Sequence, residues 1–324
     1  MLSRTAENLF WIARYIERAE SMSRLIEMGS RMAMLPTFAG REEWRSILIA
    51  ARTDIEASPD HRVTEAEIIH ELILSLDNPS SIASCLKSAR NNGRNVRSAI
   101  TQEMWEALND GWARLANLDE LTAQRELPSL IDWIKQRSSI FRGAAETGMI
   151  RDDGYNFLRL GGALERADMT LRLLDIKYYV LLPDIDRIGG GRDHHQWTSI
   201  LHAMSATRAY QWVYRGDFSP WRIADFLILN SSFPRSVHFC YQQIGHFLNR
   251  LNHGYAPQTN SHAVAQEMIS KMAESDMSEI FRDGLHEFIL DAIAHTHRLN
   301  SAISESFFLN ICILLDDSNT SEVC

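Results

Sequence analysis

Two stretches of the chain repeat the same arrangement of acidic and basic residues. The first, YIERAESMSRLIEM, begins at Tyr15, and the second, ALERADMTLRLLDI, begins at Ala163. A carboxylate in an enclosed site can act as a general acid or base because desolvation raises its pKa, and arginines can hold an anionic substrate. The residues of this motif network are Glu17, Arg18, Glu20 and Arg24, followed by Glu165, Arg166, Asp168 and Arg172.

The helical positions of these residues leave two interpretations open. Successive residues of a helix advance by about 100°, so Glu17, Glu20 and Arg24 form a strip that borders an apolar face. The other side of the helix, near Trp11, is apolar too, which predicts an enclosed helix with paired charges. The network is either a set of buried ion pairs that fixes the packing register or a polar cavity for a ligand. In the second case Glu17 or Glu165 is the candidate catalytic acid or base.

A second basic cluster lies in SARNNGRNVRSAI. On one helix, Arg90, Arg94 and Arg97 stand at positions i, i+4 and i+7 and share a face, with Asn91 nearby. Three arginines on one face repel one another unless anionic groups lie opposite them. Those groups could be acidic side chains of the same protein or a carboxylate or phosphate ligand. Arg235, at the start of a helix, is a further candidate for binding an anion.

Apolar residues at three- and four-residue spacing predict an all-α fold. The breaks between helices fall at prolines and glycines, and no stretch shows sustained period-two alternation. We expect helices near 4–34, 41–54, 64–76, 80–110, 127–148, 153–182, 194–214, 219–230, 234–253, 261–274 and 277–313.

Further matches in the same order indicate an internal duplication. The offset between Glu17 and Glu165 is 148 residues. The segment WRSIL matches WTSIL at an offset of 153 residues, and PSSIASC matches PRSVHFC at an offset of 155. Matches that occur in the same order, with offsets that change by a few residues at loops, are typical of a repeated helical unit. We therefore expect one domain over 1–324, a helical bundle of two units of about five helices with pseudo-twofold symmetry. The repeats cover about 1–150 and 151–324.

Composition and local sequence features limit the classes of partner and the cellular compartment that we expect. The net charge of −9 argues against nucleic acid as the main partner, since phosphate binding needs a basic face. No apolar run approaches the ~18 residues of a membrane span, and the first residues lack the features of a signal peptide. The four cysteines are scattered without CxxC spacing, as in a reduced compartment. We expect a cytoplasmic protein with no nucleic-acid or membrane partner.

The sequence predicts neither a cofactor nor a metal site. The glycines at 189–191 are not followed by the Gly-Lys-Ser/Thr of a phosphate-binding loop. The segment EIIH at 67–70 is half of a di-iron motif, but no second ExxH occurs. Asp291, His295 and His297 lie near one helix end, where polar residues are usually solvated.

These motifs resemble the alpha-E family, a bacterial all-helical domain named for a recurring Glu-Arg motif. After Arg90 the family usually has Glu-Asn, whereas this chain has Asn91-Asn92. The acid of the family at that position is therefore absent here. The matching segments follow the family's order: NLFWIARYIERAESMSRLI, NPSSIASCLKSARNNGRNVRSAI, LRLGGALERADMTLRLLDIKYYVLL and FLILNSSFPRSV.

The resemblance implies a protein encoded beside, or fused to, a circularly permuted ATP-grasp ligase. Transglutaminase-like cysteine peptidases and a proteasome-like peptidase are frequent companions, a setting that suggests the formation and trimming of peptide or amide bonds. Two functions remain open. The chain is either a non-catalytic accessory protein that docks the ligase or presents its peptide substrate, or a helical enzyme that uses the buried Glu/Arg site on an anionic peptide-like substrate. The first function predicts an exposed apolar patch that faces a partner.

Overall fold

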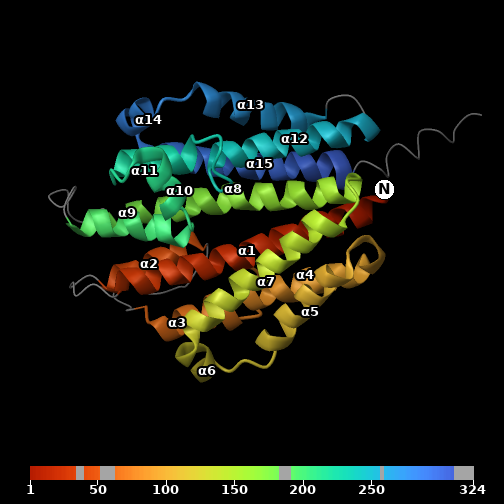
Figure 1. Cartoon of the computed structure of the whole chain (residues 1–324), viewed down its shortest axis with the longest axis horizontal. Coiled ribbons are helices and arrows are strands. Elements are labelled where there is room, and N and C mark those ends of the chain that lie inside the picture. The colour runs from red at the N-terminus through yellow and green to blue at the C-terminus, as the bar shows by residue number, and fades with distance from the viewer. Residues whose placement is uncertain (34–39, 52–62, 182–190, 256–258, 310–324) are drawn as a thin grey trace, which may run out of the picture.

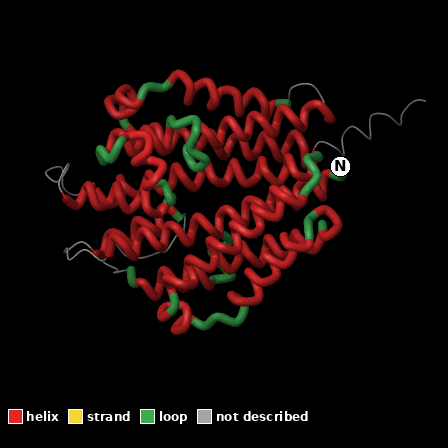
Figure 2. Tube along the Cα trace, viewed as in Figure 1, coloured by secondary structure: helices red, strands yellow, loops and turns green. Residues whose placement is uncertain are grey.

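The computed structural model describes residues 1–33, 40–51, 63–181, 191–255 and 259–309, and within them every regular element is a helix (Figures 1 and 2). The predicted all-α fold class is confirmed. None of the described helices combines the length and the apolar character that a membrane span requires.

The α-helices are α1 (Ser3–Ala33), α2 (Gly40–Ala50), α3 (Glu65–Ile69), α4 (Ile82–Asn95), α5 (Gln102–Leu115), α6 (Glu120–Arg125), α7 (Leu127–Gly148), α8 (Asp153–Leu181), α9 (Gly191–Ala203), α10 (Thr207–Tyr214), α11 (Pro220–Ile228), α12 (Val237–Tyr255), α13 (Asn260–Glu274), α14 (Met277–Asp283) and α15 (Leu285–Ser304). Short π or 3-10 turns lie at His70–Leu74, Arg97–Ala99 and Glu305–Leu309.

Two long helices, α1 and α8, lie side by side through the middle of the molecule and run in the same direction (Figure 1). A glycine brings their backbones together, because a Cβ atom on Gly161 would lie only 2.2 Å from the carbonyl oxygen of Phe10. Helices α4 and α7 pack on α1, and α12 and α15 pack on α8. Helix α5 covers α4 and α7, and α13 covers α12 and α15. The central pair is therefore enclosed by helices on both sides.

Enclosure explains the unusual composition of α1 and α8. Both helices bury apolar side chains around their whole circumference, as at Leu9, Ile12 and Leu25 of α1. Charged side chains are buried among them, including Glu17 and Glu20. The prediction that the motif helix is enclosed is confirmed.

The helix predicted over 80–110 is divided in the structure. Helix α4 ends at Asn95, and a 3-10 turn follows it. The backbone is extended at Ile100, and the side chain of Thr101 then accepts a hydrogen bond from the backbone N–H of Met104, which starts α5. Helix α6, which begins after the cap residue Asp119, was not predicted. Capping residues therefore set the helix boundaries here, although the apolar spacing continues across them.

Two other predicted helices are divided at residues with positive φ. Over 194–214 the break lies at Ser205, whose φ is 53°. Over 277–313 it lies at Gly284, whose φ is 117° and which separates α14 from α15. A positive φ ends an α-helix, and apolar spacing does not reveal it. Some predicted helix ends, at 34, 52–54, 182 and 310–313, and residues 189–190 of the glycine segment lie outside the described residues.

Candidate functional site

The Glu-Arg motifs of α1 and α8 face each other. Arg166 of α8 donates from Nε and Nη2 to the two carboxylate oxygens of Glu17, at 2.8 and 2.7 Å. In return, Arg18 of α1 donates to the two oxygens of Glu165, at 2.5 and 3.1 Å. Only 1% of the Glu17 side chain and none of the Glu165 side chain is exposed. Each glutamate thus receives a two-point, charge-assisted clamp from the opposite helix, which sets the register of the pair.

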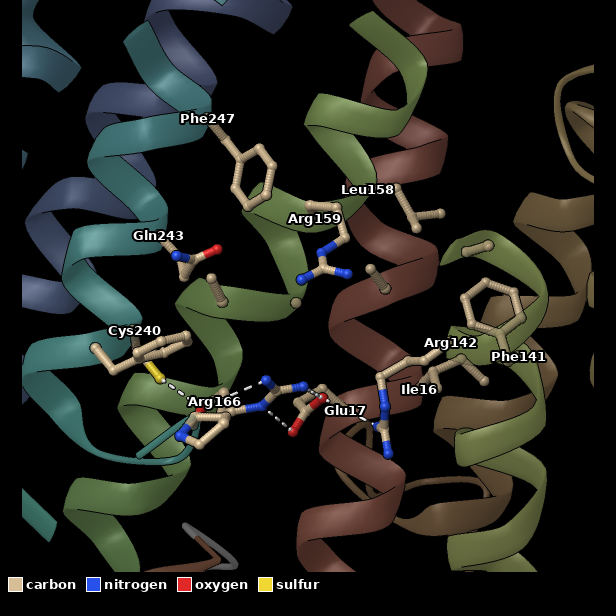
Figure 3. Close-up of a pocket in the computed structure, with 16 residues that line it drawn as sticks. Ile16, Glu17, Phe141, Arg142, Leu158, Arg159, Arg166, Cys240, Gln243 and Phe247 are labelled. Atoms are coloured by element: carbon tan, nitrogen blue, oxygen red, sulfur yellow. Dashed lines mark hydrogen bonds and ion pairs between the residues drawn. The ribbon is translucent and has the colours of Figure 1, made fainter. Parts of the chain in front are cut away.

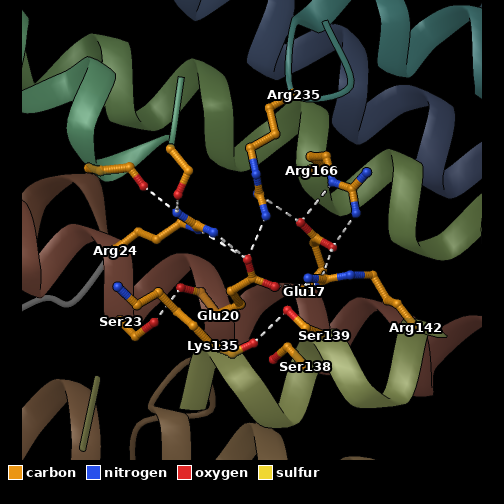
Figure 4. A network of polar contacts seen from close by, with 12 residues as sticks. Glu17, Glu20, Ser23, Arg24, Lys135, Ser138, Ser139, Arg142, Arg166 and Arg235 are labelled. Atoms are coloured by element: carbon orange, nitrogen blue, oxygen red, sulfur yellow. Dashed lines mark hydrogen bonds and ion pairs between the residues drawn. The ribbon is translucent and has the colours of Figure 1, made fainter. Parts of the chain in front are cut away.

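Further arginines converge on Glu17 and Glu20 of α1 (Figure 4). Nη1 of Arg142, on α7, lies 3.2 Å from Glu17 Oε2 and also contacts Glu20. Arg235, which precedes α12, donates from Nη1 to Glu17 at 3.2 Å and from Nη2 to Glu20. Arg24 donates to Glu20 from one turn further along α1, at 2.7 Å. Together with Arg166, these arginines contact the carboxylates of both Glu17 and Glu20.

We call this group the Glu17 cluster. It contains two carboxylates and four guanidinium groups, so it carries an excess of two positive charges. Helices α1, α7 and α8 and the segment before α12 contribute to it, so tertiary packing assembles it. Its members are Glu17, Glu20, Arg24, Arg142, Arg166 and Arg235.

The pKa values in the Glu17 cluster follow from these charges. Burial by itself would raise the pKa of Glu17, but Arg166 and Arg142 hold it well below its ordinary value. At Glu20, burial again acts to raise the pKa, but the charges of Arg235 and the neighbouring arginines outweigh it and the pKa falls to about 2. Burial, helped by the like charge of Arg24, outweighs the attraction of Glu20 and lowers the pKa of Arg235 to about 10.

A second group, the Glu165 cluster, surrounds the acidic strip of α8. Arg14 donates from Nε to Glu165 at 2.7 Å, in addition to the bond from Arg18. Arg172 donates to Asp168 at 2.6 Å. Burial would raise the pKa of Asp168, but hydrogen bonds from His297 and Arg172 lower it. The cluster, whose charged members are Arg14, Arg18, Glu165, Asp168 and Arg172, has two carboxylates and three guanidinium groups.

The two candidate catalytic carboxylates are ionised at neutral pH. We expected desolvation to raise the pKa of Glu17 or Glu165 towards neutrality, and this expectation is wrong. Burial acts in that direction, but the arginines around each carboxylate outweigh it and lower both pKa values. A carboxylate held in this state carries no proton to donate near pH 7, and the guanidinium N–H groups occupy its oxygens.

A cavity of about 220 Å³ lies beside Glu17, between α1, α7, α8 and α12 (Figure 3). Glu17, Arg142 and Arg166 line its polar end. Further along, Arg159 of α8 and Gln243 of α12 face the same space (Figure 3). Its apolar walls include Ile16, Phe141, Leu158, Phe239 and Phe247.

The predicted basic stripe does not form one helix face. Helix α4 ends at Asn95, so Arg97 lies in the following 3-10 turn and not at position i+7 of the helix. Arg90 donates to the side-chain oxygen of Asn109 at 2.6 Å, and Arg94 is exposed. The guanidinium groups of Arg90 and Arg97 both lie within 6 Å of the ring centre of Trp105. No carboxylate in the described part of the chain lies within ion-pair distance of these arginines, and Asn91 is exposed beside them.

Of the sequence-predicted candidates for anion binding, only Arg235 lies in the network. The sequence analysis missed Arg142 and Arg14, which complete the two clusters. Neither forms a recognisable motif, since Arg142 lies on a helix without a Glu-Arg pair and Arg14 precedes the motif by one turn. Only the packing of the bundle brings Arg142 and Arg14 to the two clusters. The spacing of residues along the chain does not predict these contacts.

The three polar residues of DAIAHTH point to different partners. Asp291 accepts from Lys271 at 2.5 Å, His295 lies 3.4 Å from Glu267, and His297 lies 3.4 Å from Asp168. Within the described ranges, no group of three or more His, Cys, Asp or Glu side chains is placed to hold a metal ion.

A comparison with known families identifies a family with the same Glu-Arg motif. The Alpha-E family, described as a predicted alpha-helical domain with a conserved ER motif, matches residues 1–308. The chain belongs to the Alpha-E family. In this member the Glu-Arg sequence occurs twice, at Glu17-Arg18 and Glu165-Arg166, and the two copies bind each other.

Relatives of this Alpha-E chain occur in mycobacteria. An uncharacterized protein of Mycobacterium bovis is 21% identical over 326 residues, which cover 91% of this chain and 35% of the relative. An uncharacterized protein of Mycobacterium tuberculosis strain H37Rv is 20% identical over the same shares. The chain thus spans about a third of the length of the curated relatives that it matches. No solved structure matches it.

Proposed function

We propose that this chain is a non-catalytic accessory protein of a peptide- or amide-bond-forming system. In this role it docks onto an ATP-grasp ligase or presents the peptide substrate of that ligase in the cytoplasm. The proposal rests on one structural observation, an exposed apolar surface on α10 and α11. This is the kind of patch that an accessory function requires.

We call this feature the Trp212 surface. It comprises Trp212 and Val213 of α10 and Trp221 of the adjoining α11, whose residues are 88%, 47% and 38% exposed. The opposite face of α10 packs on α11, since Tyr210 is buried and its ring centre lies 5.6 Å from that of Phe226. Tryptophan is one of the side chains enriched among the residues that dominate binding energy in protein interfaces. The surface therefore suits a protein partner.

Two arguments support an ATP-grasp ligase as that partner. The Alpha-E resemblance implies a gene setting in which such a ligase is the neighbour or the fused domain. In the mycobacterial relatives, the region similar to this chain is about a third of a longer polypeptide. A domain that is joined to other sequence in its relatives is expected to act together with a partner.

The state of the carboxylates favours the accessory function over the enzyme. An enzyme that used Glu17 or Glu165 as general acid or base on an anionic peptide-like substrate would need a pKa near neutrality. The arginines hold both pKa values below the ordinary range. The buried network then acts as a scaffold for the helices that present the outer surfaces.

We also infer that the bundle consists of two duplicated units related by pseudo-twofold symmetry. Supporting this, the contact of Glu17 with Arg166 is returned by Glu165 with Arg18. A twofold relation requires such an exchange of equivalent contacts. The thiols of Cys85 and Cys240, 155 residues apart, each lie 3.7 Å from a proline carbonyl oxygen six residues earlier.

The proposal is tested by calorimetric titration of the chain with the ATP-grasp protein encoded beside it, with and without nucleotide. We expect a dissociation constant in the micromolar range or tighter. Trp212→Ala should weaken binding by about thirtyfold, equivalent to about 2 kcal/mol for a dominant interface residue. Leu121→Ala is the matched control, because Leu121 is 78% exposed on α6, away from the Trp212 surface. If no heat is detected, or if both variants bind like the original chain, the proposed docking is wrong.

A further inference from the structure

We propose that the cavity beside Glu17 binds a small carboxylate that carries an apolar group. The C-terminal residue of a peptide and a free acid of similar size share this chemistry. The inference rests on the cavity alone and does not depend on docking through the Trp212 surface.

Two arginines bring unused hydrogen-bond donors to this cavity. Arg142 uses its Nη1 atom for the contacts with Glu17 and Glu20. Arg159 uses its Nη1 atom to donate to Glu146 at 2.6 Å. Within the part of the chain that the structure describes, no residue accepts from Nε or Nη2 of either arginine. A guanidinium group has five N–H donors, so each arginine retains donors for a ligand.

The charge of the site selects an anion. The Glu17 cluster carries two more positive than negative charges, and its buried members are shielded from solvent. A bound carboxylate would offset part of this excess, whereas a cation would add to it. Guanidinium groups match a carboxylate geometrically, because two parallel N–H donors meet its two oxygens. Figure 3 shows Arg142 beside Glu17 and Arg159 further along the same space, with Gln243 facing it as an additional polar group.

The remaining walls select an apolar body of limited size. Phe141 of α7, Phe247 of α12 and Leu158 of α8 line the cavity. Its volume of about 220 Å³ is below the roughly 300–1,000 Å³ of sites for drug-sized ligands. The cavity therefore suits a ligand about the size of one amino acid.

Gly162 leaves room for this cavity, and the equivalent place beside Glu165 is filled. Arg14 stands 148 residues before Gly162, the same offset that separates Glu17 from Glu165. The side chain of Arg14 donates to Glu165 at 2.7 Å and also contacts Asn300. At Gly162, in contrast, a Cβ atom would meet only the Cβ of Ala13, at 3.8 Å. Glycine in place of arginine thus leaves an open space beside an arginine-rich cluster.

Calorimetric titration of the chain with N-acetyl-phenylalanine tests the proposal. We expect a dissociation constant of about 1 mM or tighter. N-acetyl-phenylalaninamide has the same shape without the charge and should bind at least tenfold more weakly. A pentapeptide that ends in phenylalanine identifies the source: binding like the acetylated residue indicates a peptide terminus, and binding of the small acid alone indicates a free acid. If neither acid binds at 10 mM, or if the amide or inorganic phosphate binds as well as the acid, the proposal is overturned.

Two variants locate the binding. Arg159→Gln removes a donor of the cavity whose present partner, Glu146, is on the surface. Gly162→Leu fills the cavity from a position with free space. Both should keep the melting temperature within a few degrees and weaken N-acetyl-phenylalanine binding by about tenfold or more, equivalent to about 1.4 kcal/mol. Arg125→Gln, on the exposed surface of α6, is the matched control and should bind like the original chain. If both cavity variants bind like the control, the ligand lies elsewhere and the proposal fails.

Discussion

Arg166 of α8 donates two hydrogen bonds to the carboxylate of Glu17 on α1, although the residues lie 149 positions apart in the chain. The carboxylate is almost completely buried, and two more arginines reach it. Removing one charge from such an interior pair leaves its partners unpaired, which costs far more than losing a surface pair. The Glu-Arg motif therefore has a direct consequence for stability.

We expect Glu17→Gln to lower the free energy of unfolding by about 3–5 kcal/mol, because buried guanidinium groups lose their counter-charge. Urea denaturation measures the loss. Glu27→Gln is the control on the same helix; Glu27 is partly exposed and pairs with Arg31 and Lys135, so a loss of about 1 kcal/mol or less is expected. A fully stable Glu17→Gln chain would show that the pair is not structural and would revive the enzyme hypothesis.

The close approach of α1 and α8 predicts opposite results for two neighbouring glycines. Gly161→Ala should destabilise the protein by about 1–3 kcal/mol, because its Cβ would lie 2.2 Å from the backbone oxygen of Phe10, which cannot move alone. Gly162→Ala should be neutral or stabilising by up to about 1 kcal/mol, since alanine favours the helix and meets no close atom. Thermal melting of both variants checks this contrast. Equal melting temperatures would contradict the backbone contact.

Stability should fall in acid. The pKa values of Glu17 and Glu20 are lower in the folded protein than in the unfolded chain, where about 4.5 is expected for both. Their contribution is therefore fully present above about pH 4.5 and is lost as the pH falls towards the folded value, about 2 for Glu20. Urea denaturation at pH 7, 5 and 3 should give similar values at the first two and a lower one at pH 3. In Glu20→Gln the drop between pH 5 and pH 3 should be smaller, and an unchanged drop would assign it to other groups.

The thiols of Cys85 and Cys240 should be unreactive in the folded protein. Both side chains are fully buried, and burial raises the pKa of each thiol to about 12. Mass spectrometry after treatment with iodoacetamide at pH 8 should find neither residue labelled in the native chain and both labelled in urea. Rapid native labelling of either one would indicate that the helices around the clusters open readily.

The spacing of residues along the chain was sufficient to predict part of the fold and of the candidate site. The all-α class follows from apolar residues at three- and four-residue intervals, since that spacing identifies the face that a helix buries. The same reasoning placed Glu17, Glu20 and Arg24 on one strip and predicted an enclosed helix. It did not detect the start of α5 or the end of α9, because the Thr101 cap and the positive φ at Ser205 depend on single backbone conformations.

The sequence by itself therefore determined the all-α class, the two Glu-Arg motifs and the resemblance to the family, all of which depend on residues close together along the chain. Only the tertiary structure decided which charges meet. Arg142 reaches Glu17 across a helix interface, whereas Arg97 leaves its expected helix face. It also decided the sign of the pKa shift at Glu17, because burial and nearby arginines act in opposite directions and their balance depends on distances of a few ångströms. The open space at Gly162 has the same origin, since a cavity exists only between helices that have packed.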